Sequence, residues 1–255
     1  MPRIAIVTGS DSGIGRATAV RLAQEGCDVG VTWHRDERGA RETAEEVASH
    51  GRRAEVRRTD VSSVDDAIAL VDELAGALGG LDVFVNNAGT GHSTPVLELD
   101  LEHWRRVVDT DLTGAFFAAQ AAARRMAAQG RGGRIVNVTS VHEHVPLKGS
   151  VAYTAAKHGL GGVTKVMALE LAEHGITVNS VAPGEISTPM TGQPDTDPHT
   201  QKRPGVPAGR PGDAREIAAA IAYLCSPDAS YTTGASFVVD GGMLLMAAMA
   251  NQLAT

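Results

Sequence analysis

Short apolar runs alternate along this chain with longer stretches of helical periodicity, and this alternation constrains the fold more than any other feature. The runs with the length and composition of buried strands cover residues 3–8, 28–33, 54–59, 81–86, 134–140, 176–181 and 235–240. The stretches with Ala, Leu, Glu and Arg at helical spacing cover residues 14–26, 38–50, 63–78, 101–128, 151–174 and 213–225. Strand–helix repeats of this kind wind around a parallel sheet. The sequence therefore predicts an α/β fold, with a seven-stranded parallel sheet and helices on both faces.

Size and charge narrow the classes of protein. A chain of 255 residues that is 43% hydrophobic suits one domain, residues 1–255, with a sizeable core. The net charge is −7 and Lys and Arg are scattered, so we expect no nucleic-acid partner. No apolar stretch reaches the length that a bilayer requires and no cleavable signal stands at the start, which predicts a soluble, cytoplasmic protein without membrane contact. Cys27 and Cys225 lack disulfide or metal-ligand spacing, so we expect no metal site.

Residues 184–212 interrupt the strand–helix rhythm. Proline stands at positions 189, 194, 198, 204, 207 and 211, so a regular helix cannot run through the segment. We interpret it as a substrate loop or lid.

A glycine-rich turn joins the first predicted strand to the first helix. In the run Thr-Gly-Ser-Asp-Ser-Gly-Ile-Gly at 8–15, Gly9 permits a tight turn and Gly13 lets backbone amides approach a phosphate. Gly15 allows the helix to pack closely on the strand. The N-terminus of that helix adds positive potential. A turn in this context predicts a dinucleotide pyrophosphate site.

Three residues with complementary chemistry follow the fifth strand. Ser140 closes that strand, Tyr153 comes thirteen residues later, and Lys157 lies one helical turn further on the same helix face. A phenol is a poor base near neutral pH, but an adjacent ammonium and an oxidised nicotinamide both favour the phenolate. Ser140 can donate a hydrogen bond to a carbonyl oxygen as negative charge develops there. This spacing predicts a catalytic group centred on Tyr153.

These motifs, together with Asn86-Asn87-Ala88-Gly89 after the fourth strand, resemble the short-chain dehydrogenase/reductase family over nearly the entire chain. The resemblance implies a single NAD(P)-binding Rossmann domain. It also implies an oxidoreductase that moves a hydride between nicotinamide and a carbonyl or secondary alcohol, with Tyr153 as general acid or base. The residues that we expect to bind the cofactor are Gly9, Ser12, Gly13, Ile14, Gly15, His34, Arg35, Asp60, Val61, Asn87, Ala88, Gly89, Tyr153, Lys157, Pro183, Gly184, Ile186 and Thr188.

One position departs from the family pattern. Asp111 stands where the family usually has an Asn that completes a proton relay with the lysine. An Asp keeps the shape and accepts hydrogen bonds, but it loses the amide donor and places a charge near Lys157. We expect Asp111 to belong to the catalytic group and to shift the pH profile.

The second strand bears on the choice of cofactor. A carboxylate at its end would accept the ribose hydroxyls of NAD and repel the 2′-phosphate of NADP, and none is present. His34 and Arg35 follow instead, which favours NADP(H). Ser12 at a position where NADP-preferring relatives often carry a basic residue, and Asp36 close by, argue the other way, so NAD(H) remains the alternative.

The substrate is less constrained, because it depends on loops. Ser140-Val141-His142-Glu143 resembles the same segment of bacterial glucose 1-dehydrogenases, so His142, Glu143 and His144 are candidates for contact with a polyol or, equally, form a polar loop. The motif set also resembles 3-oxoacyl-thioester reductases. We expect a 3-oxoacyl-type or small-ketone reductase, with a sugar dehydrogenase as the alternative and a non-catalytic, cofactor-sensing regulator as the rival from another class.

The C-terminal tail, residues 242–255, begins with apolar residues that are too few to span a bilayer. The family resemblance implies a homotetramer or homodimer formed through the tyrosine-bearing helix and the last strand. Gly159, Gly161 and Gly162 on that helix suit such an interface. We therefore expect the tail to lie at a subunit interface.

Overall fold

A single parallel sheet organises the molecule. The computed structural model describes residues 2–91, 93–193 and 196–246. The strands are β1 (Ile4–Val7), β2 (Asp28–Trp33), β3 (Ala54–Arg58), β4 (Val83–Asn86), β5 (Gly133–Val138), β6 (Ile176–Pro183) and β7 (Ser236–Val239). They pair in the order β3-β2-β1-β4-β5-β6-β7, and every pairing is parallel. The seven-stranded α/β prediction is confirmed, with strand ends that differ by one or two residues.

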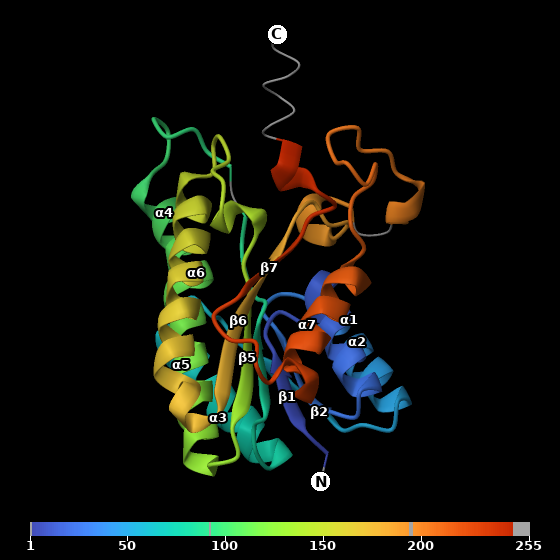
Figure 1. Ribbon diagram of the computed structural model, residues 1–255, viewed down its shortest axis with the longest axis vertical. Helices are drawn as coiled ribbons and strands as arrows, with labels where there is room; N and C mark the ends of the chain where they lie inside the picture. Colours follow the sequence, from blue (N-terminus) through green and yellow to red (C-terminus); the bar gives the residue numbers. More distant parts are fainter. Residues whose placement is uncertain (1, 92, 194–195, 247–255) are drawn as a thin grey trace.

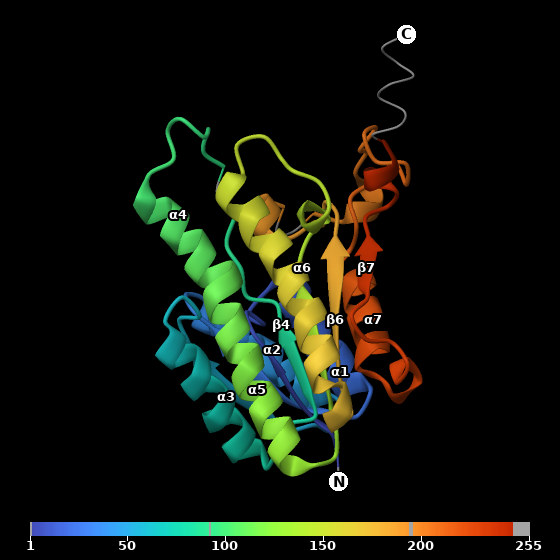
Figure 2. The ribbon, with the colours of Figure 1, turned by 60° about the vertical axis from the view of Figure 1, so that its left-hand side comes forward.

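Helices cover both faces of this sheet (Figures 1 and 2). One face carries α1 (Gly13–Gln24), α2 (Glu37–Ser49) and α7 (Ala214–Cys225). The other carries α3 (Val64–Leu78), α5 (Ala115–Gln129) and α6 (Val151–Leu171), with α4 (Leu101–Val108) leading into α5. Buried aliphatic side chains fill the space between sheet and helices on each face. This burial supplies the main driving force for the layered fold.

The stretch at 101–128 differs from the single regular helix that its periodicity predicts. A π-helical segment, Asp109–Gly114, separates α4 from α5 without breaking the helical path. Its wider turn buries Asp111, which accepts a hydrogen bond through Oδ1 from the Thr90 amide at 2.7 Å. Gly114 packs so closely that a Cβ there would lie 1.6 Å from the carbonyl oxygen of Val61. Both contacts join residues that are distant in the sequence, so local periodicity could not reveal the change.

The proline-rich loop lies beside the carboxyl ends of the strands. Its described residues form short 3-10 turns at Pro189–Thr191 and Pro198–Thr200. Ile186 pairs with Gly212 at the base of the loop, and Arg203 Nε lies 2.6 Å from Glu185 Oε1 across it. The segment is therefore tied at its base and through its middle. Of the tail at 242–255, only residues 242–246 are among those described.

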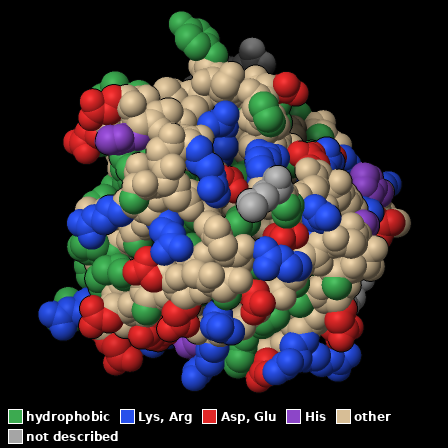
Figure 3. Space-filling model, turned by 90° about the horizontal axis from the view of Figure 1, so that it is seen from below, with side chains coloured by type: hydrophobic (Ala, Val, Ile, Leu, Met, Phe, Trp, Pro, Cys, Tyr) green, Lys and Arg blue, Asp and Glu red, His purple; other side chains and the backbone are tan. Residues whose placement is uncertain are grey.

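The surface carries mixed charge. On the face seen in Figure 3, Lys and Arg side chains are interspersed with Asp and Glu. No helix in the described part of the chain is long and apolar enough to cross a membrane.

Candidate active site

The glycine-rich turn between β1 and α1 has the shape of a phosphate cradle. Gly9 and Gly13 adopt φ of +60° and +53°, a region that disfavours residues with a Cβ. A Cβ at Gly15 would lie 2.0 Å from the Gly9 carbonyl oxygen, so the close packing of helix on turn requires glycine. Ser12, at the N-cap position of α1, makes no side-chain hydrogen bond to the first amides of the helix. Those amides are left oriented toward an anion, which fits a pyrophosphate.

The segment after β4 locks this turn in place. Asn87 Nδ2 donates to the carbonyl oxygens of Thr8 and Gly9, both at 2.9 Å. The amides of Asn87 and Ala88 both donate to Thr8 Oγ1 at 2.9 Å. Gly89 then passes next to the catalytic group, since a Cβ there would lie 3.6 Å from Lys157 Nζ. The expected residues Asn87, Ala88 and Gly89 therefore connect the glycine turn with Lys157.

The residues expected at the adenosine end also lie together. His34 Nε2 is 3.8 Å from Asp60 Oδ2, and both His34 and Arg35 are exposed. Asp60 Oδ1 accepts from the hydroxyl and the amide of Ser62, and these hydrogen bonds lower the pKa of Asp60. Burial raises the pKa of the Asp11 carboxyl in the glycine turn, and the charge of Asp36 adds to that effect. Charges of both signs thus surround the end of β2.

The segment after β6 lies against the glycine turn. Pro183 ends β6, and the Gly184 amide donates to the Val239 carbonyl oxygen at 3.0 Å. A Cβ on Gly13 would lie 3.3 Å from the Thr188 side chain. Thr188 is buried, and its amide donates to Thr191 Oγ1 at 3.1 Å. Residues 183–188 are therefore placed beside the start of α1, where the resemblance expects the nicotinamide end of the cofactor.

The catalytic candidates meet at the carboxyl ends of the central strands. Ser140 follows β5 and is nearly buried, and α6 carries Tyr153 and Lys157 one turn apart. Lys157 Nζ lies 5.4 Å from the Tyr153 ring centroid. It donates to the Val138 carbonyl oxygen at 3.3 Å. A hydroxyl donor, a phenol and an ammonium therefore lie on the side of the sheet where the strands have their carboxyl ends.

Asp111 reaches this group from the π-helical segment. Its Oδ2 is 3.2 Å from Lys157 Nζ, and both side chains are buried, at 1% and 4% exposure. Burial raises the pKa of the Asp111 carboxyl, against the attraction of Lys157 and the Thr90 amide. Burial also opposes the charged form of Lys157, but the attraction of Asp111 and Tyr153 outweighs it and raises the pKa of Lys157. Asp111 therefore holds Lys157 as an ammonium to higher pH.

The three residues proposed for polyol contact have different surroundings. The His142 ring stands edge-on to the Tyr153 ring, with centroids 6.2 Å apart. His144 is exposed, and its Nε2 lies 3.0 Å from Ser236 Oγ. Glu143 is only 7% exposed, and its carboxylate accepts hydrogen bonds from hydroxyl groups of the protein. The Glu143 side chain is enclosed between the sheet and α6, which favours a structural role over direct polyol contact. His142 lies beside Tyr153.

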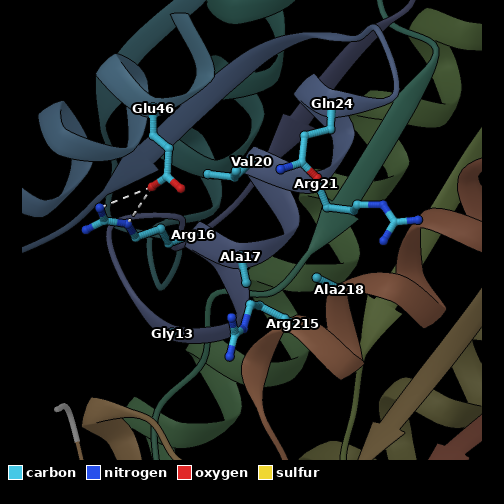
Figure 4. A pocket seen from close by; sticks show the side chains of 9 residues that line it. All are labelled: Gly13, Arg16, Ala17, Val20, Arg21, Gln24, Glu46, Arg215 and Ala218. Atoms are coloured by element: carbon cyan, nitrogen blue, oxygen red, sulfur yellow. Dashed lines mark hydrogen bonds and ion pairs between the residues drawn. The ribbon is translucent and has the colours of Figure 1, made fainter. Parts of the chain in front are cut away.

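A hollow of about 370 Å³ lies on the outer side of α1, between α2 and α7 (Figure 4). Gly13 of the glycine turn is among its lining residues, and none of the catalytic candidates is. Arginines line it, and each is paired with a carboxylate of the same chain. Arg16 contacts Glu46 at 3.2 Å and Arg21 contacts Glu25 at 2.9 Å. Arg215 pairs with Asp213. These pairs neutralise the cationic lining, so we assign no ligand to this hollow.

Two contributors were not expected from the sequence. The Thr90 amide fixes Asp111, and a backbone donor leaves no signal in the side-chain pattern. Asn137 is fully buried in β5, accepts from Asn86 Nδ2 at 3.0 Å and donates to Thr164 Oγ1 on α6 at 2.9 Å. Its signal was available, because a polar amide in the run Ile135–Val138 must find hydrogen-bond partners when buried.

Comparison with known proteins identifies the relatives of this chain. Residues 9–244 match the family model described as enoyl-(acyl carrier protein) reductase. The chain is 51% identical over 245 residues to the uncharacterized oxidoreductase YohF of Escherichia coli K12, covering 96% of this chain and 97% of the relative. A crystal structure titled acetoin dehydrogenase YohF from Salmonella typhimurium superposes with a TM-score of 0.90 at 53% identity, covering 96% of this chain and 97% of that one.

The two member types named from sequence motifs are also among the relatives. Glucose 1-dehydrogenase 2 of Bacillus subtilis is 40% identical, with 95% of each chain covered. A 3-oxoacyl-[acyl-carrier-protein] reductase of Synechocystis is 39% identical, covering 95% of this chain and 97% of the relative. The resemblance inferred from the glycine turn, the Asn-Asn-Ala-Gly segment and the catalytic spacing is confirmed.

Proposed function

Because this chain belongs to the short-chain dehydrogenase/reductase family and is an oxidoreductase of that family, we propose that Tyr153 transfers the proton while a small ketone and its secondary alcohol are interconverted. The observation that carries this proposal is that buried Lys157 lies 5.4 Å from the Tyr153 ring and donates to the Val138 carbonyl oxygen, two residues before Ser140. A regulator that only senses the cofactor has no need of this group.

Each residue has a distinct task in the proposed reaction. Ser140 donates a hydrogen bond to the substrate oxygen and holds it within reach of the Tyr153 hydroxyl. Tyr153 gives its proton to that oxygen during reduction and receives it during oxidation. The Lys157 ammonium, 5.4 Å from the Tyr153 ring, stabilises the phenolate that remains after reduction. Asp111, with Oδ2 3.2 Å from Lys157 Nζ, favours the charged form of that ammonium.

A nicotinamide dinucleotide would supply or accept the hydride at the substrate carbon when it is bound. The turn at Gly9–Gly15 and the free amides of α1 would hold its pyrophosphate. Asp60 and Val61 would lie at its adenine end, and residues 183–188 at its nicotinamide end. The close approach of Gly13 to Thr188 supports this assignment, because one extended ligand can contact both.

We further propose that NADP(H) is preferred over NAD(H). Arg35 is exposed at the end of β2, where a guanidinium can pair with a 2′-phosphate. Asp11 and Asp36 oppose this preference, since a carboxylate repels phosphate. We expect these two carboxylates to reduce the preference for NADP(H) over NAD(H) without reversing it.

For the substrate, we propose a short hydroxyketone or diketone of the acetoin type. The name acetoin dehydrogenase on a structure that is 53% identical to this chain supports that class. A 3-oxoacyl thioester is the second candidate, supported by the relative from Synechocystis. Three parallel assays would separate these classes from a sugar dehydrogenase: reduction of 2,3-butanedione with NADPH, reduction of a 3-oxoacyl thioester with NADPH, and oxidation of glucose with NADP+.

The test of the proposed chemistry is Tyr153→Phe. This change keeps the ring and removes the proton, so we expect kcat for 2,3-butanedione reduction to fall at least about a hundredfold. Nucleotide binding, measured by fluorescence titration, should stay within about threefold of the native value, because the phosphate cradle is intact. Native-like turnover by this variant would refute the role of Tyr153. Absence of any turnover by the native enzyme with all three substrates would favour the regulator instead.

Arg35→Ala tests the cofactor preference. Loss of a charge-assisted hydrogen bond to phosphate should lower kcat/KM for NADPH about tenfold or more and leave that for NADH unchanged. Asp11→Ser is the counterpart, because it removes a repelling carboxylate and should raise kcat/KM for NADPH alone. Steady-state kinetics with both nucleotides check both variants. A native preference for NADH that Arg35→Ala does not alter would show that the NADP(H) proposal is wrong.

A further inference from the structure

A row of polar side chains crosses the sheet beneath α6. Asn86, Asn137, Ser180 and Ser236 are register partners on β4, β5, β6 and β7, so they share one face of the sheet. Asn86 Nδ2 donates to the Ala115 carbonyl oxygen at 2.6 Å, and Asn137 reaches Thr164 on α6. Polar groups in such a buried layer require partners. The two asparagines find theirs on α5 and α6.

The two serines of the row find theirs in Glu143. Its Oε2 accepts from Ser180 Oγ and from Ser236 Oγ, each at 3.1 Å. A third hydroxyl, Thr139 Oγ1 at the end of β5, donates to the same oxygen at 2.6 Å. Oε1 is buried with no hydrogen-bond partner among the described residues. One carboxylate therefore connects the end of β5 with the middle of β6 and the start of β7.

Glu143 is also the last residue of the turn that starts at the catalytic serine. Ser140 is the N-cap of the 3-10 turn Val141–Glu143, and the Glu143 amide donates to the Ser140 carbonyl oxygen at 2.8 Å. The His142 amide donates to Ser140 Oγ at 3.2 Å. Fixing the Glu143 side chain thus fixes the far end of a turn whose near end holds the Ser140 hydroxyl.

The helix that carries Tyr153 is shaped to admit this carboxylate. A Cβ on Gly161 would lie 2.5 Å from Glu143 Oε1 and 2.7 Å from its Cδ. Tyr153 and Lys157 stand on the same helix, two turns and one turn before Gly161. Contact with Glu143 therefore fixes where α6 lies relative to the turn that begins at Ser140.

Stability alone is a poor explanation for such a group. Burying a carboxylate costs free energy that its hydrogen bonds at best offset, and apolar side chains of similar size often serve stability as well or better. Directed hydrogen bonds to three strands do what an apolar side chain cannot, since they fix the orientation of the turn. A misplacement of about 1 Å in a reacting group can lower a rate about a hundredfold.

We propose that Glu143 is a positioning residue, which holds Ser140 at the distance from Tyr153 that proton transfer requires. Gly161 leaves the space on α6 that the Glu143 carboxylate occupies. This inference rests on the proposed function of Ser140 and Tyr153. It assigns Glu143 no contact with the substrate.

The test compares Glu143→Ala and Glu143→Gln in the reduction of 2,3-butanedione. The alanine variant should lose about tenfold to a hundredfold in kcat, while the dissociation constant of the nucleotide stays native. The glutamine variant keeps a carbonyl oxygen for the three hydroxyls and should recover most of that loss. A fall in nucleotide affinity that parallels the fall in kcat would indicate mere support of the fold and overturn the proposal, as would native kcat in Glu143→Ala.

Two further comparisons keep the inference testable if Glu143→Ala does not fold. Ser236→Ala removes one of the three hydroxyls that donate to Glu143 Oε2, so it should lower kcat while the dissociation constant of the nucleotide stays native. Gly161→Ala should reproduce the loss of kcat, whereas Gly162→Ala, where a Cβ meets nothing within 4 Å, should not. Equal activity of these two glycine variants would overturn the proposal. Tyr153→Phe, measured alongside, reports separately on the proposed function.

Discussion

Asp111 is the residue at which this chain differs most clearly in its chemistry from the family pattern. Its carboxylate lies 3.2 Å from Lys157 Nζ, in a site where both groups are buried. An ion pair in such surroundings is screened little by solvent, so each charge acts strongly on the other. The carboxylate of Asp111 therefore has an effect that the amide of an Asn would not have. It ties the charge state of Lys157 to its own.

Asp111→Asn should therefore move the alkaline limb of the pH–rate profile. Asp111 raises the pKa of Lys157, so the lysine stays an ammonium to higher pH than it would alone. Removing the carboxylate lets Lys157 lose its proton at lower pH, so the decline of activity should begin at lower pH than in the native enzyme. Activity near neutral pH should survive. Initial rates of ketone reduction across the pH range check this, and superimposable profiles would deny the acid any special role.

The sequence predicted local chemistry better than long-range contact. Tyr153 and Lys157 could be paired because helix geometry alone puts residues four apart on one face. Glu143 was interpreted as a polar loop residue or a contact to a polyol substrate, because the residues near it in the sequence do not reveal its contacts with Gly161 and Ser236. The direction of a side chain in a short turn depends on partners that only the folded chain brings near.

At the scale of elements, the π-helical segment Asp109–Gly114 matters most. The sequence predicted helix throughout 101–128, which is correct in outline, but the wider turn that delivers Asp111 to Lys157 follows from contacts with Val61 and Thr90. Strand positions were predictable because buried parallel strands leave short apolar runs. The path between α4 and α5 was not, because the constraint lies in another part of the chain.

Gly114→Ala tests the importance of that contact. The added Cβ would lie 1.6 Å from the Val61 carbonyl oxygen, so the segment must shift, at a cost of roughly 1–3 kcal/mol in unfolding free energy. We expect lower thermal stability together with lower kcat, since Asp111 moves with the segment. Gly76→Ala in α3, where a Cβ meets nothing within 4 Å, is the matched control. It should stabilise the protein by about 0.5–1 kcal/mol. Equal effects of the two variants would exclude a special constraint at Gly114.

At the scale of the whole molecule, the helix α6 has two faces with different roles. Gly159 and Gly161 are accounted for inside one chain, because a Cβ at either would press on Leu112 or Glu143. The outer face of the same helix exposes Val166 at 53% and Leu169 at 81%. Apolar side chains one turn apart on an exposed helix are typical of an interface. These glycines therefore serve packing within one chain, and the exposed aliphatic side chains are the candidates for contact with a partner subunit.

We therefore predict that the native protein is a homodimer or homotetramer and that Leu169→Glu weakens its assembly. A carboxylate introduced into an apolar interface must be desolvated without a partner, which opposes association strongly. Light scattering at micromolar concentration should give the mass of two or four chains for the native protein and a smaller mass for the variant. Leu97→Glu, at a leucine that is 97% exposed in the loop before α4, is the control and should leave the mass unchanged. A native protein that scatters as one chain of 26.5 kDa would contradict the prediction, and the exposed face of α6 would then need another explanation.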